Sequence, residues 1–243
     1  MLIRSKLKIS TAIFVVSMIA MLGLLIIATS TFEKNLKITQ YIGEIKVDIL
    51  LLRASEKDFI ARKKLKYSDK FSEYLEKIHQ NVNKVGDLLA GGGSRVVEIA
   101  ILAKVLDEYK HNFTAIVALQ QKIGLHAKDG LYGKLRVSVH DVEALIGQQD
   151  FQLLSRMLQL RRNEKDFMLR LDEKYVEKHS NNIELLLIDL ENCQLDSVTI
   201  ERIKSLVKQY QAAFLNLVKA QKSLGFNAQS GLKSAMEESL SQV

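Results

Sequence analysis

The sequence predicts an all-α protein of two stacked four-helix bundles, preceded by an N-terminal transmembrane helix. Three observations predict this fold class. The 243 residues contain no proline, the residue that most strongly interrupts helices. Apolar residues recur at alternating spacings of four and three, as on the buried face of a packed helix. Most of the chain after residue 31 consists of an internal sequence repeat, which indicates two copies of one helical unit.

The transmembrane helix is predicted at 11–30, TAIFVVSMIAMLGLLIIATS, which is uncharged and mostly apolar. About 20 residues at roughly 1.5 Å each cross the ~30 Å apolar core of a bilayer. The alternative is a cleaved signal peptide, whose apolar region is usually only about 7–15 residues long. Basic residues within 1–10 place that end in the cytoplasm and 31–243 outside. We therefore expect a cell inner membrane protein with a periplasmic domain.

The repeat is clearest in two pairs of segments. LRASEKDFIAR at 52–62 returns as LRRNEKDFMLR at 160–170, and the segment 109–131 returns as 210–232. Each copy is predicted to begin with one long helix that carries an apolar stripe through the Glu-Lys-Asp-Phe motif. A turn and a returning helix follow in each copy.

Turns and helix breaks are predicted from glycine and polar clusters. GGGS at 91–94 ends the first long helix, and ENCQLDS at 191–197 ends the second. The returning helices break at GLHAKDG, 124–130, and at GFNAQSG, 225–231. Helix lengths place these breaks at the height of the Glu-Lys-Asp-Phe motifs.

These breaks divide the domain into two predicted modules. The proximal module is about 31–55, 131–163 and 231–243, and the distal module is about 59–125 and 167–226.

Four residues of the repeated motif are predicted to form the joint between the modules: Glu56, Glu164, Phe59 and Phe167. The two glutamates occupy the apolar stripe, where an unpaired carboxylate is unfavourable. We expect the free backbone N–H groups where 131–146 and 231 onward begin to bind these carboxylates.

Composition and motifs argue against several functions. The net charge is +7, but three of these charges lie within the first eight residues, and the remainder is too scattered to predict nucleic-acid binding. The sequence shows no glycine-rich phosphate loop, zinc-ligand spacing or nucleophile elbow. We predict neither catalytic residues nor a metal or cofactor. The five histidines are predicted to lie on the surface.

LRRNEKDFMLR, its copy at 52–62 and GLYGKLRVSVHDVE at 130–143 resemble the helical bimodular (HBM) sensor domain. This domain is the extracytoplasmic input region of many bacterial methyl-accepting chemotaxis receptors and some sensor histidine kinases. The resemblance covers roughly 32–243. It implies two long and four short helices and a parallel homodimer. The family usually has a second membrane helix, which these 243 residues do not include.

The resemblance also implies a function. Family members bind small organic acids, such as C4-dicarboxylates, citrate or acetate, and a chemoreceptor transmits a helix displacement across the membrane. Two alternatives stay open. In the first, the chain is the input domain of a sensor histidine kinase that recognises a periplasmic binding protein. In the second, it is a structural or adaptor protein without a ligand.

Candidate ligand residues are sought among arginines, because a guanidinium offers a planar fork of donors to a carboxylate. Arg53 and Arg161 lie at the edge of the predicted core, and arginines on the long helices of the family contact ligands. The alternative is that each arginine forms an ion pair within its own helix, with the glutamate three residues later, Glu56 or Glu164. Such a pair contributes only about 0.2–0.5 kcal/mol.

Tyr132 and Arg136 are added to the ligand-binding set. They open the short helix that follows the first glycine break, and a helix N-terminus favours an anion. Arg62 and Arg170, in contrast, each follow an aspartate by four residues. We expect these two arginines to form ordinary ion pairs along the helix.

Overall fold

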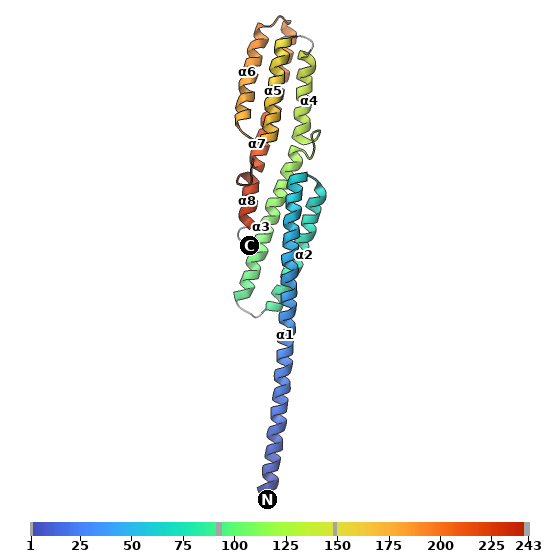
Figure 1. Ribbon diagram of the computed structural model, residues 1–243, viewed down its shortest axis with the longest axis vertical. Helices are drawn as coiled ribbons and strands as arrows, with labels where there is room; N and C mark the ends of the chain where they lie inside the picture. The colour runs from blue at the N-terminus through green and yellow to red at the C-terminus, as the bar shows by residue number, and fades with distance from the viewer. Residues whose placement is uncertain (1, 91–93, 148–149, 241–243) are drawn as a thin grey trace. The chain divides into compact units, whose positions relative to one another are not determined.

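The computed structural model describes residues 2–90, 94–147 and 150–240, and this part of the chain is all-α, without strands. The helices are α1 (Leu2–Arg62), α2 (Leu65–Leu89), α3 (Ser94–Ile123), α4 (Gly130–Ile146), α5 (Phe151–Arg170), α6 (Lys174–Asn192), α7 (Ser197–Leu224) and α8 (Gly231–Leu240) (Figure 1). The all-α prediction is confirmed.

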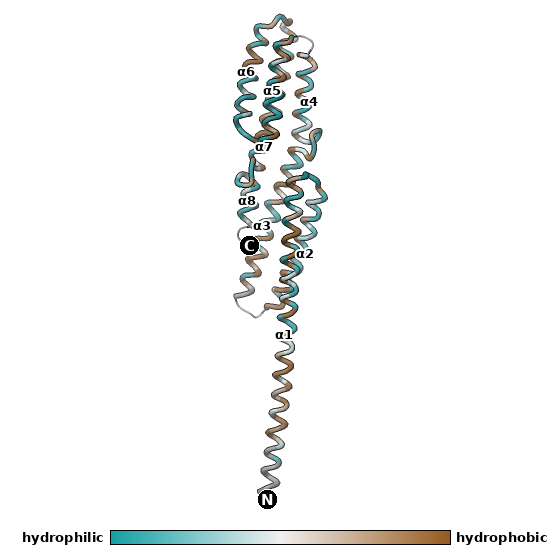
Figure 2. Tube along the Cα trace, in the orientation of Figure 1, coloured by the Kyte–Doolittle hydropathy of each residue, from teal (hydrophilic) through white to brown (hydrophobic). Residues whose placement is uncertain are grey.

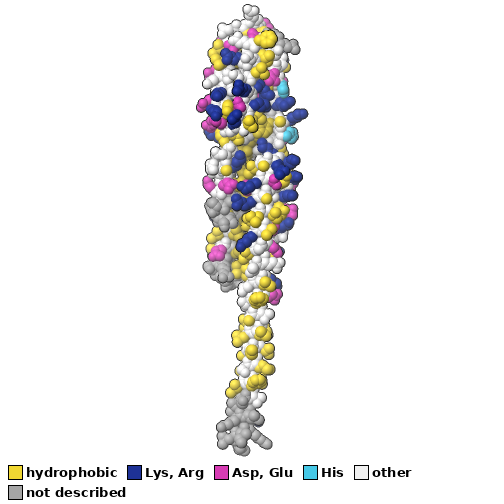
Figure 3. All heavy atoms as spheres, viewed as in Figure 1, with side chains coloured by type: hydrophobic (Ala, Val, Ile, Leu, Met, Phe, Trp, Pro, Cys, Tyr) yellow, Lys and Arg dark blue, Asp and Glu magenta, His cyan; other side chains and the backbone are white. Residues whose placement is uncertain are grey.

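The N-terminal helix α1 is unusually long, with 61 residues. Its strongest apolar window has a mean hydropathy of 2.7, and none of that window is buried within the protein. The apolar segment is the brown stretch near the N-terminus in Figure 2 and carries exposed hydrophobic side chains in Figure 3. By length and composition, α1 is the one helix among the described residues that could cross a membrane.

The prediction of one long helix at the start of each copy is wrong, because each of these two segments forms a helical hairpin. α1 ends at Arg62 and α2 begins at Leu65, and α5 ends at Arg170 before α6 begins at Lys174. Both hairpins are antiparallel. Asn81 of α2 donates a hydrogen bond to Glu44 of α1 over 3.0 Å.

The second hairpin is closed by a similar contact. Arg156 near the start of α5 pairs with Asp189 near the end of α6, with 2.7 Å between Nε and Oδ2. This pairing requires the chain to reverse between the two helices, so α5 and α6 cannot form one continuous helix.

The reversals occur at non-glycine residues in the left-handed conformation. Lys63 has φ 53° and Leu171 has φ 50°. Their N–H groups bind the carbonyls of Phe59 and Phe167, both over 2.7 Å, which caps the preceding helix. Because side chains other than glycine rarely adopt this conformation, neither reversal was evident from glycine or proline signals.

The described turns otherwise lie where the sequence predicts them. α6 ends at Asn192 and α7 begins at Ser197, where Asp196 caps the helix by accepting from the N–H of Thr199 over 2.9 Å. The breaks at 124–130 and 225–231 separate α3 from α4 and α7 from α8. Residues 91–93 of the predicted GGGS turn lie outside the described residues.

The chain divides into two compact units. Unit 1 comprises Met1–Ser55 and Asp69–Ala103, and unit 2 comprises Glu56–Ser68 and Lys104–Val243. These bounds differ from the predicted modules, because the reversal after Arg62 brings α2 back alongside α1. In unit 1, the antiparallel α1–α2 pair buries Ile45 and Leu52 of α1, and Ile78 and Val82 of α2.

Unit 2 contains a four-helix bundle of α4, α5, α6 and α7. α4 packs on α7, α7 on α6, α6 on α5 and α5 on α4, which closes the ring. Its buried apolar side chains come from all four helices: Leu135, Val139, Val142, Leu153, Met157, Leu160, Ile183, Leu186, Leu190, Ile203 and Val207. The part of α3 from Lys104 onward and all of α8 also belong to unit 2, and Asn112 of α3 donates to the carbonyl of Ala235 over 3.3 Å.

Candidate functional site

Two buried carboxylates mark equivalent positions of the repeat in unit 2. Glu56 on α1 and Glu164 on α5 are each only 1% exposed. The hydroxyl of Tyr109 donates to Glu56, and the hydroxyl of Tyr210 donates to Glu164 over 3.0 Å. The two tyrosines are also equivalent residues of the repeat. Each copy therefore places one tyrosine hydroxyl on its core carboxylate, which satisfies part of the hydrogen-bonding capacity of that group.

The prediction that backbone N–H groups of a restarting helix bind Glu164 was wrong. Its hydrogen bonds come from the side chains of Tyr210 and Arg161 rather than from backbone N–H groups of a restarting helix. Side-chain donors reach this carboxylate because α7 passes α5 as an unbroken helix at that level. Phe167, one turn further along α5, is the residue that lies near the second break, 5.9 Å from Phe226 between ring centroids.

Arg161 is the centre of a charged cluster between α4, α5 and α7. Its Nη1 donates to both oxygens of Glu164, over 2.8 and 2.7 Å. Its Nε lies 3.2 Å from Glu143 on α4. The ion pair three residues apart, one of the two alternatives for Arg161, is therefore present. A second carboxylate also binds the guanidinium.

Burial and charge act in opposite directions on this cluster. Burial acts to lower the pKa of Arg161, but the charges of Glu164 and Glu143 outweigh it, so the pKa of the guanidinium is raised. Burial raises the pKa of the Tyr210 hydroxyl, and the negative charge of Glu164 raises it further. The cluster therefore contains a fixed cation, and a tyrosine that stays protonated at physiological pH.

Lys165 and His140 complete the surroundings of the two carboxylates. Lys165 Nζ lies 3.1 Å from Glu164, and His140 Nδ1 lies 3.2 Å from Glu143. Glu143 is the more accessible carboxylate, since its side chain is 28% exposed and that of Glu164 is 1% exposed. The arrangement can bind an incoming anion if that anion takes the place of Glu143 on Arg161.

The other three predicted ligand residues lie elsewhere. Tyr132 is eleven residues before Glu143 on α4, about 16 Å away along the helix axis. Arg136 is exposed on the same helix. Arg53 is half-buried in unit 1 and has no carboxylate within ion-pair distance among the described residues of that unit.

Tyr132 lines a small cavity in unit 2, of about 140 Å³. Its hydroxyl accepts a hydrogen bond from Nε2 of Gln221 over 2.8 Å, and burial raises its pKa. Phe59 and Gln120 also line this cavity. Gln120 and Gln221 are equivalent, identical residues of the repeat, and that identity was the signal by which the sequence could have indicated them.

His179 is a buried residue that the sequence analysis placed wrongly on the surface. It is 0% exposed and stacks on Phe214, with 4.1 Å between ring centroids and an interplanar angle of 27°. Neither ring nitrogen has a hydrogen-bond partner within the part of the chain that the structure describes. Burial lowers its pKa to about 3, so the ring is neutral and packs as an aromatic residue. The signal was its position in the repeat, because the equivalent residue of the first copy is Phe71.

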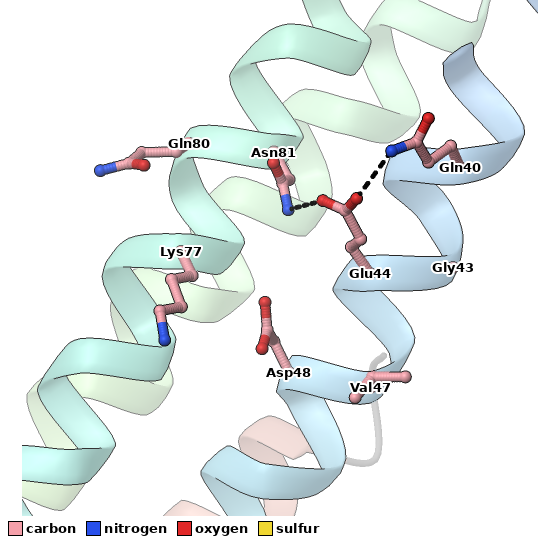
Figure 4. A pocket seen from close by; sticks show the side chains of 8 residues that line it. All are labelled: Gln40, Gly43, Glu44, Val47, Asp48, Lys77, Gln80 and Asn81. Atoms are coloured by element: carbon pink, nitrogen blue, oxygen red, sulfur yellow. Dashed lines mark hydrogen bonds between the residues drawn. The ribbon is translucent and has the colours of Figure 1, made fainter.

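Unit 1 contains an open groove of about 590 Å³ between α1 and α2. Figure 4 shows the residues that line it: Gln40, Gly43, Glu44, Val47, Asp48, Lys77, Gln80 and Asn81. Glu44 accepts hydrogen bonds from Gln40 and Asn81, both over 3.0 Å. Two carboxylates on the α1 wall make this groove unfavourable for an anionic ligand. Among the described residues, no group of three or more His, Cys, Asp or Glu could hold a metal ion.

No family model matches the sequence, and no curated protein matches it significantly.

Proposed function

We propose that the chain is the extracytoplasmic ligand-sensing region of a membrane-anchored chemoreceptor, built as a helical bimodular sensor domain of two stacked four-helix bundles. The doubled sequence and the α4–α7 bundle of unit 2 support a bimodular architecture. The apolar segment 11–30 supports an anchor in the cell inner membrane, with 31–243 in the periplasm.

The continuity of α1 carries this proposal. One helix, Leu2–Arg62, contains both the apolar segment and Glu56, which Tyr109 binds in unit 2. A helix is held by hydrogen bonds along its axis, so a displacement near Glu56 is passed toward the apolar segment. A ligand bound in unit 2 that is held more tightly when α1 occupies one of two positions shifts the equilibrium toward that position.

The proposed ligand is a small organic acid of the C4-dicarboxylate, citrate or acetate class, and the proposed contact is Arg161. A ligand carboxylate replaces Glu143 at Nε of the guanidinium, while Glu164 keeps Nη1. This exchange keeps the charge of the cluster balanced. It also moves Glu143, and with it α4, relative to α5. Arg161 is preferred to Arg53 because Arg161 already binds a partly exposed carboxylate from a second helix.

A parallel homodimer is also proposed, through an exposed stripe of α1 in unit 1. Leu36, Val47 and Leu50 are 60%, 56% and 68% exposed. Together with Gly43 they follow spacings of seven, four and three residues, the pattern of a coiled-coil seam. Two chains anchored in one membrane present this stripe in the same direction, which favours parallel pairing.

Thermal unfolding of the full chain in lipid nanodiscs tests ligand binding. A panel of dicarboxylates, citrate and short monocarboxylates is added at constant ionic strength. At least one acid is expected to raise the unfolding temperature, and Arg161→Gln is expected to remove that increase. The matched control is Arg162→Gln, which changes an exposed neighbour with the same charge. An equal increase in both variants, or none with any acid, would contradict the proposed site.

Disulfide crosslinking tests the dimer and the displacement. Val47→Cys in a Cys193→Ser background is expected to crosslink two chains, and the active acid is expected to change the crosslinking rate. A cysteine at Lys46, exposed beside the stripe, is the control and should crosslink more slowly. A rate that the acid leaves unchanged at Val47 would argue against a ligand-driven movement of α1.

A further inference from the structure

We infer that the side-chain amine of Lys233 is a site of reversible carbamylation by carbon dioxide, in the small cavity beside Tyr132. The cavity lies entirely within unit 2 and has a volume of about 140 Å³. The modification is covalent and uses no organic acid, so it depends neither on the Arg161 cluster nor on the receptor function proposed above.

The cavity holds two lysines because the copies of the repeat differ at two of its positions. Lys63 stands where the second copy has Leu171, and Lys233 stands where the first copy has Tyr132. All four residues line the cavity. Both lysines are half-buried, and no Asp or Glu among the described residues lies within ion-pair distance of either ammonium group. Two like charges therefore share one cavity without a carboxylate between them.

The two lysines differ in how firmly they hold their protons. The ammonium of Lys63 lies 5.5 Å from the ring centroid of Tyr132, and the face of an aromatic ring attracts a cation. Burial lowers the pKa of both lysines, and the charge of Lys63 further lowers the pKa of Lys233. Lys233 is therefore the lysine that loses its proton more readily. A desolvated amine beside a second cation is a common form of nucleophilic lysine.

The amine of Lys233 is both fixed in position and accessible. Its Nζ donates to the carbonyl of Gly225 over 2.9 Å, which holds the end of the side chain in place. Lys233 also lines a groove of about 320 Å³ next to the cavity, together with Glu237, one turn later on α8. Because the side chain is only half-buried, a small molecule from solvent reaches the nitrogen along this groove.

The reaction needs only the neutral amine and carbon dioxide. The nitrogen lone pair of Lys233 attacks the carbon of CO2, and a C–N bond forms. One C–O π pair moves onto oxygen, and one N–H proton passes to solvent water. The carbamate keeps one N–H, which can still donate to Gly225. The side chain changes from a cation to an anion, so its repulsion from Lys63 is replaced by an ion pair.

The apolar wall and the volume of the cavity suit carbon dioxide. Phe59, Ile116 and Leu224 line the cavity with apolar side chains, which do not oppose the entry of a small uncharged molecule. A volume of 140 Å³ is roughly ten times the ~10–15 Å³ that one water molecule needs. The three atoms that carbamylation adds to the lysine therefore fit.

The polar wall can bind the carbamate oxygens once they form. Tyr132 accepts a hydrogen bond from Gln221 over 2.8 Å, so its own hydroxyl proton is available. Gln120 and Gln221 are 5% and 6% exposed, and each uses one amide hydrogen in a bond over 2.8 Å. Each amide nitrogen therefore has a second hydrogen to donate. These donors and the ammonium of Lys63 favour the anionic product.

Chemical trapping tests the modification. The full chain in nanodiscs is equilibrated with isotope-labelled bicarbonate and CO2, and carbamates are fixed with a trialkyloxonium salt. Peptide mass spectrometry then locates the label. We expect it at Lys233, and only background labelling at the exposed Lys64. The corresponding carbamate signal in a carbon NMR spectrum should appear with CO2 and disappear when CO2 is removed.

Variants at Lys63 test the role of the second cation. Lys63→Met should lower the labelled fraction of Lys233 about tenfold, the effect expected for losing one charge-assisted interaction. Lys63→Arg keeps the positive charge and should keep the label. Lys64→Met, at an exposed neighbour, and Arg161→Gln are the controls and should label fully.

The labelling pattern of the unchanged protein decides the inference even if a variant fails to fold. Absence of label at Lys233, or as much label at Lys64, would overturn it. So would a labelled fraction that Lys63→Met leaves unchanged. If bicarbonate raises the unfolding temperature but no label is trapped, the cavity binds an anion without covalent chemistry, and the inference is wrong.

Discussion

In the first copy of the repeat, the rings of Phe59 and Phe113 meet edge to face, with centroids 5.6 Å apart and an angle of 79°. In the second copy, Phe167 and Phe214 meet at 5.5 Å and 81°. In both copies a tyrosine one turn before the second phenylalanine donates to a buried glutamate. The packing of the shared residues is therefore nearly the same in both copies.

The residues that differ between the copies are mostly those that carry or could carry charge. His179 stands where the first copy has Phe71, Lys63 stands where the second has Leu171, and Lys233 stands where the first has Tyr132. Arg161 binds two carboxylates, whereas its equivalent, Arg53, has none within ion-pair distance among the described residues of unit 1. The comparison teaches that the residues identical in both copies maintain the helix packing. The positions at which the copies differ are where binding should be sought.

The largest expected effect tests whether the shared aromatic pairs are equivalent. Phe59→Ala and Phe167→Ala should each lower the free energy of unfolding by about 3–5 kcal/mol, because both phenylalanines are fully buried and truncation leaves a cavity. Denaturant unfolding followed by circular dichroism measures this. Phe151→Ala, at a residue 92% exposed, is the control and should change little. Costs that differ by more than about 2 kcal/mol would break the equivalence, since cavity costs at one kind of site vary by roughly that range.

The second prediction concerns pH and uses the difference between His179 and Phe71. Burial lowers the pKa of His179 to about 3, whereas a histidine in the unfolded chain titrates near 6.5. Below about pH 6.5 the unfolded state binds a proton that the folded state does not. The free energy of unfolding should therefore fall as the pH drops, by about 3 kcal/mol between pH 7 and 4.

His179→Phe places the residue of the first copy in the second copy and should remove this part of the pH dependence. Other groups also titrate in this range, so the measured quantity is the difference between the pH profiles of the variant and the unchanged protein. His111→Phe, at an exposed histidine, should leave the profile as it was. Parallel profiles for His179→Phe and the unchanged protein would show that the buried ring does not control acid stability.

The smallest effect is expected at the surface ion pairs that both copies share. Arg62 lies 2.8 Å from Asp58 and Arg170 lies 3.6 Å from Asp166, each pair four residues apart as predicted. Both arginines are more than half exposed, where solvent screens the pairs. Arg62→Gln and Arg170→Gln should leave the denaturation midpoint unchanged. A clear loss in only one variant would reveal a role for that arginine beyond the helix surface.

The sequence predicted the helical class, the apolar N-terminal helix and the two glycine breaks, because each depends on local composition. It failed at the reversals after Arg62 and Arg170. The segments there contain neither glycine nor proline, and the apolar stripe resumes afterwards with helical spacing. The available signal was a gap in each stripe, between Phe59 and Phe71 and between Leu171 and Ile183.

The candidate sites were harder to predict than the fold. Arg161 was selected for its position beside the core, but its contact with Glu143 depends on how α4 packs against α5, which no spacing in the sequence determines. Lys63 and Lys233, which line the small cavity beside Tyr132, were missed for the same reason. Lys63 and Lys233 are far apart in the chain and become neighbours only through the reversal and the second break.

The short reversal between α5 and α6 has a consequence for the order of folding. Only residues 171–173 separate the two helices, so bringing them together restricts a very short stretch of chain and loses little entropy. The contact between α4 and α7 joins segments much further apart in sequence. We therefore expect the α5–α6 pair to assemble first and to act as the template on which α4 and α7 later dock.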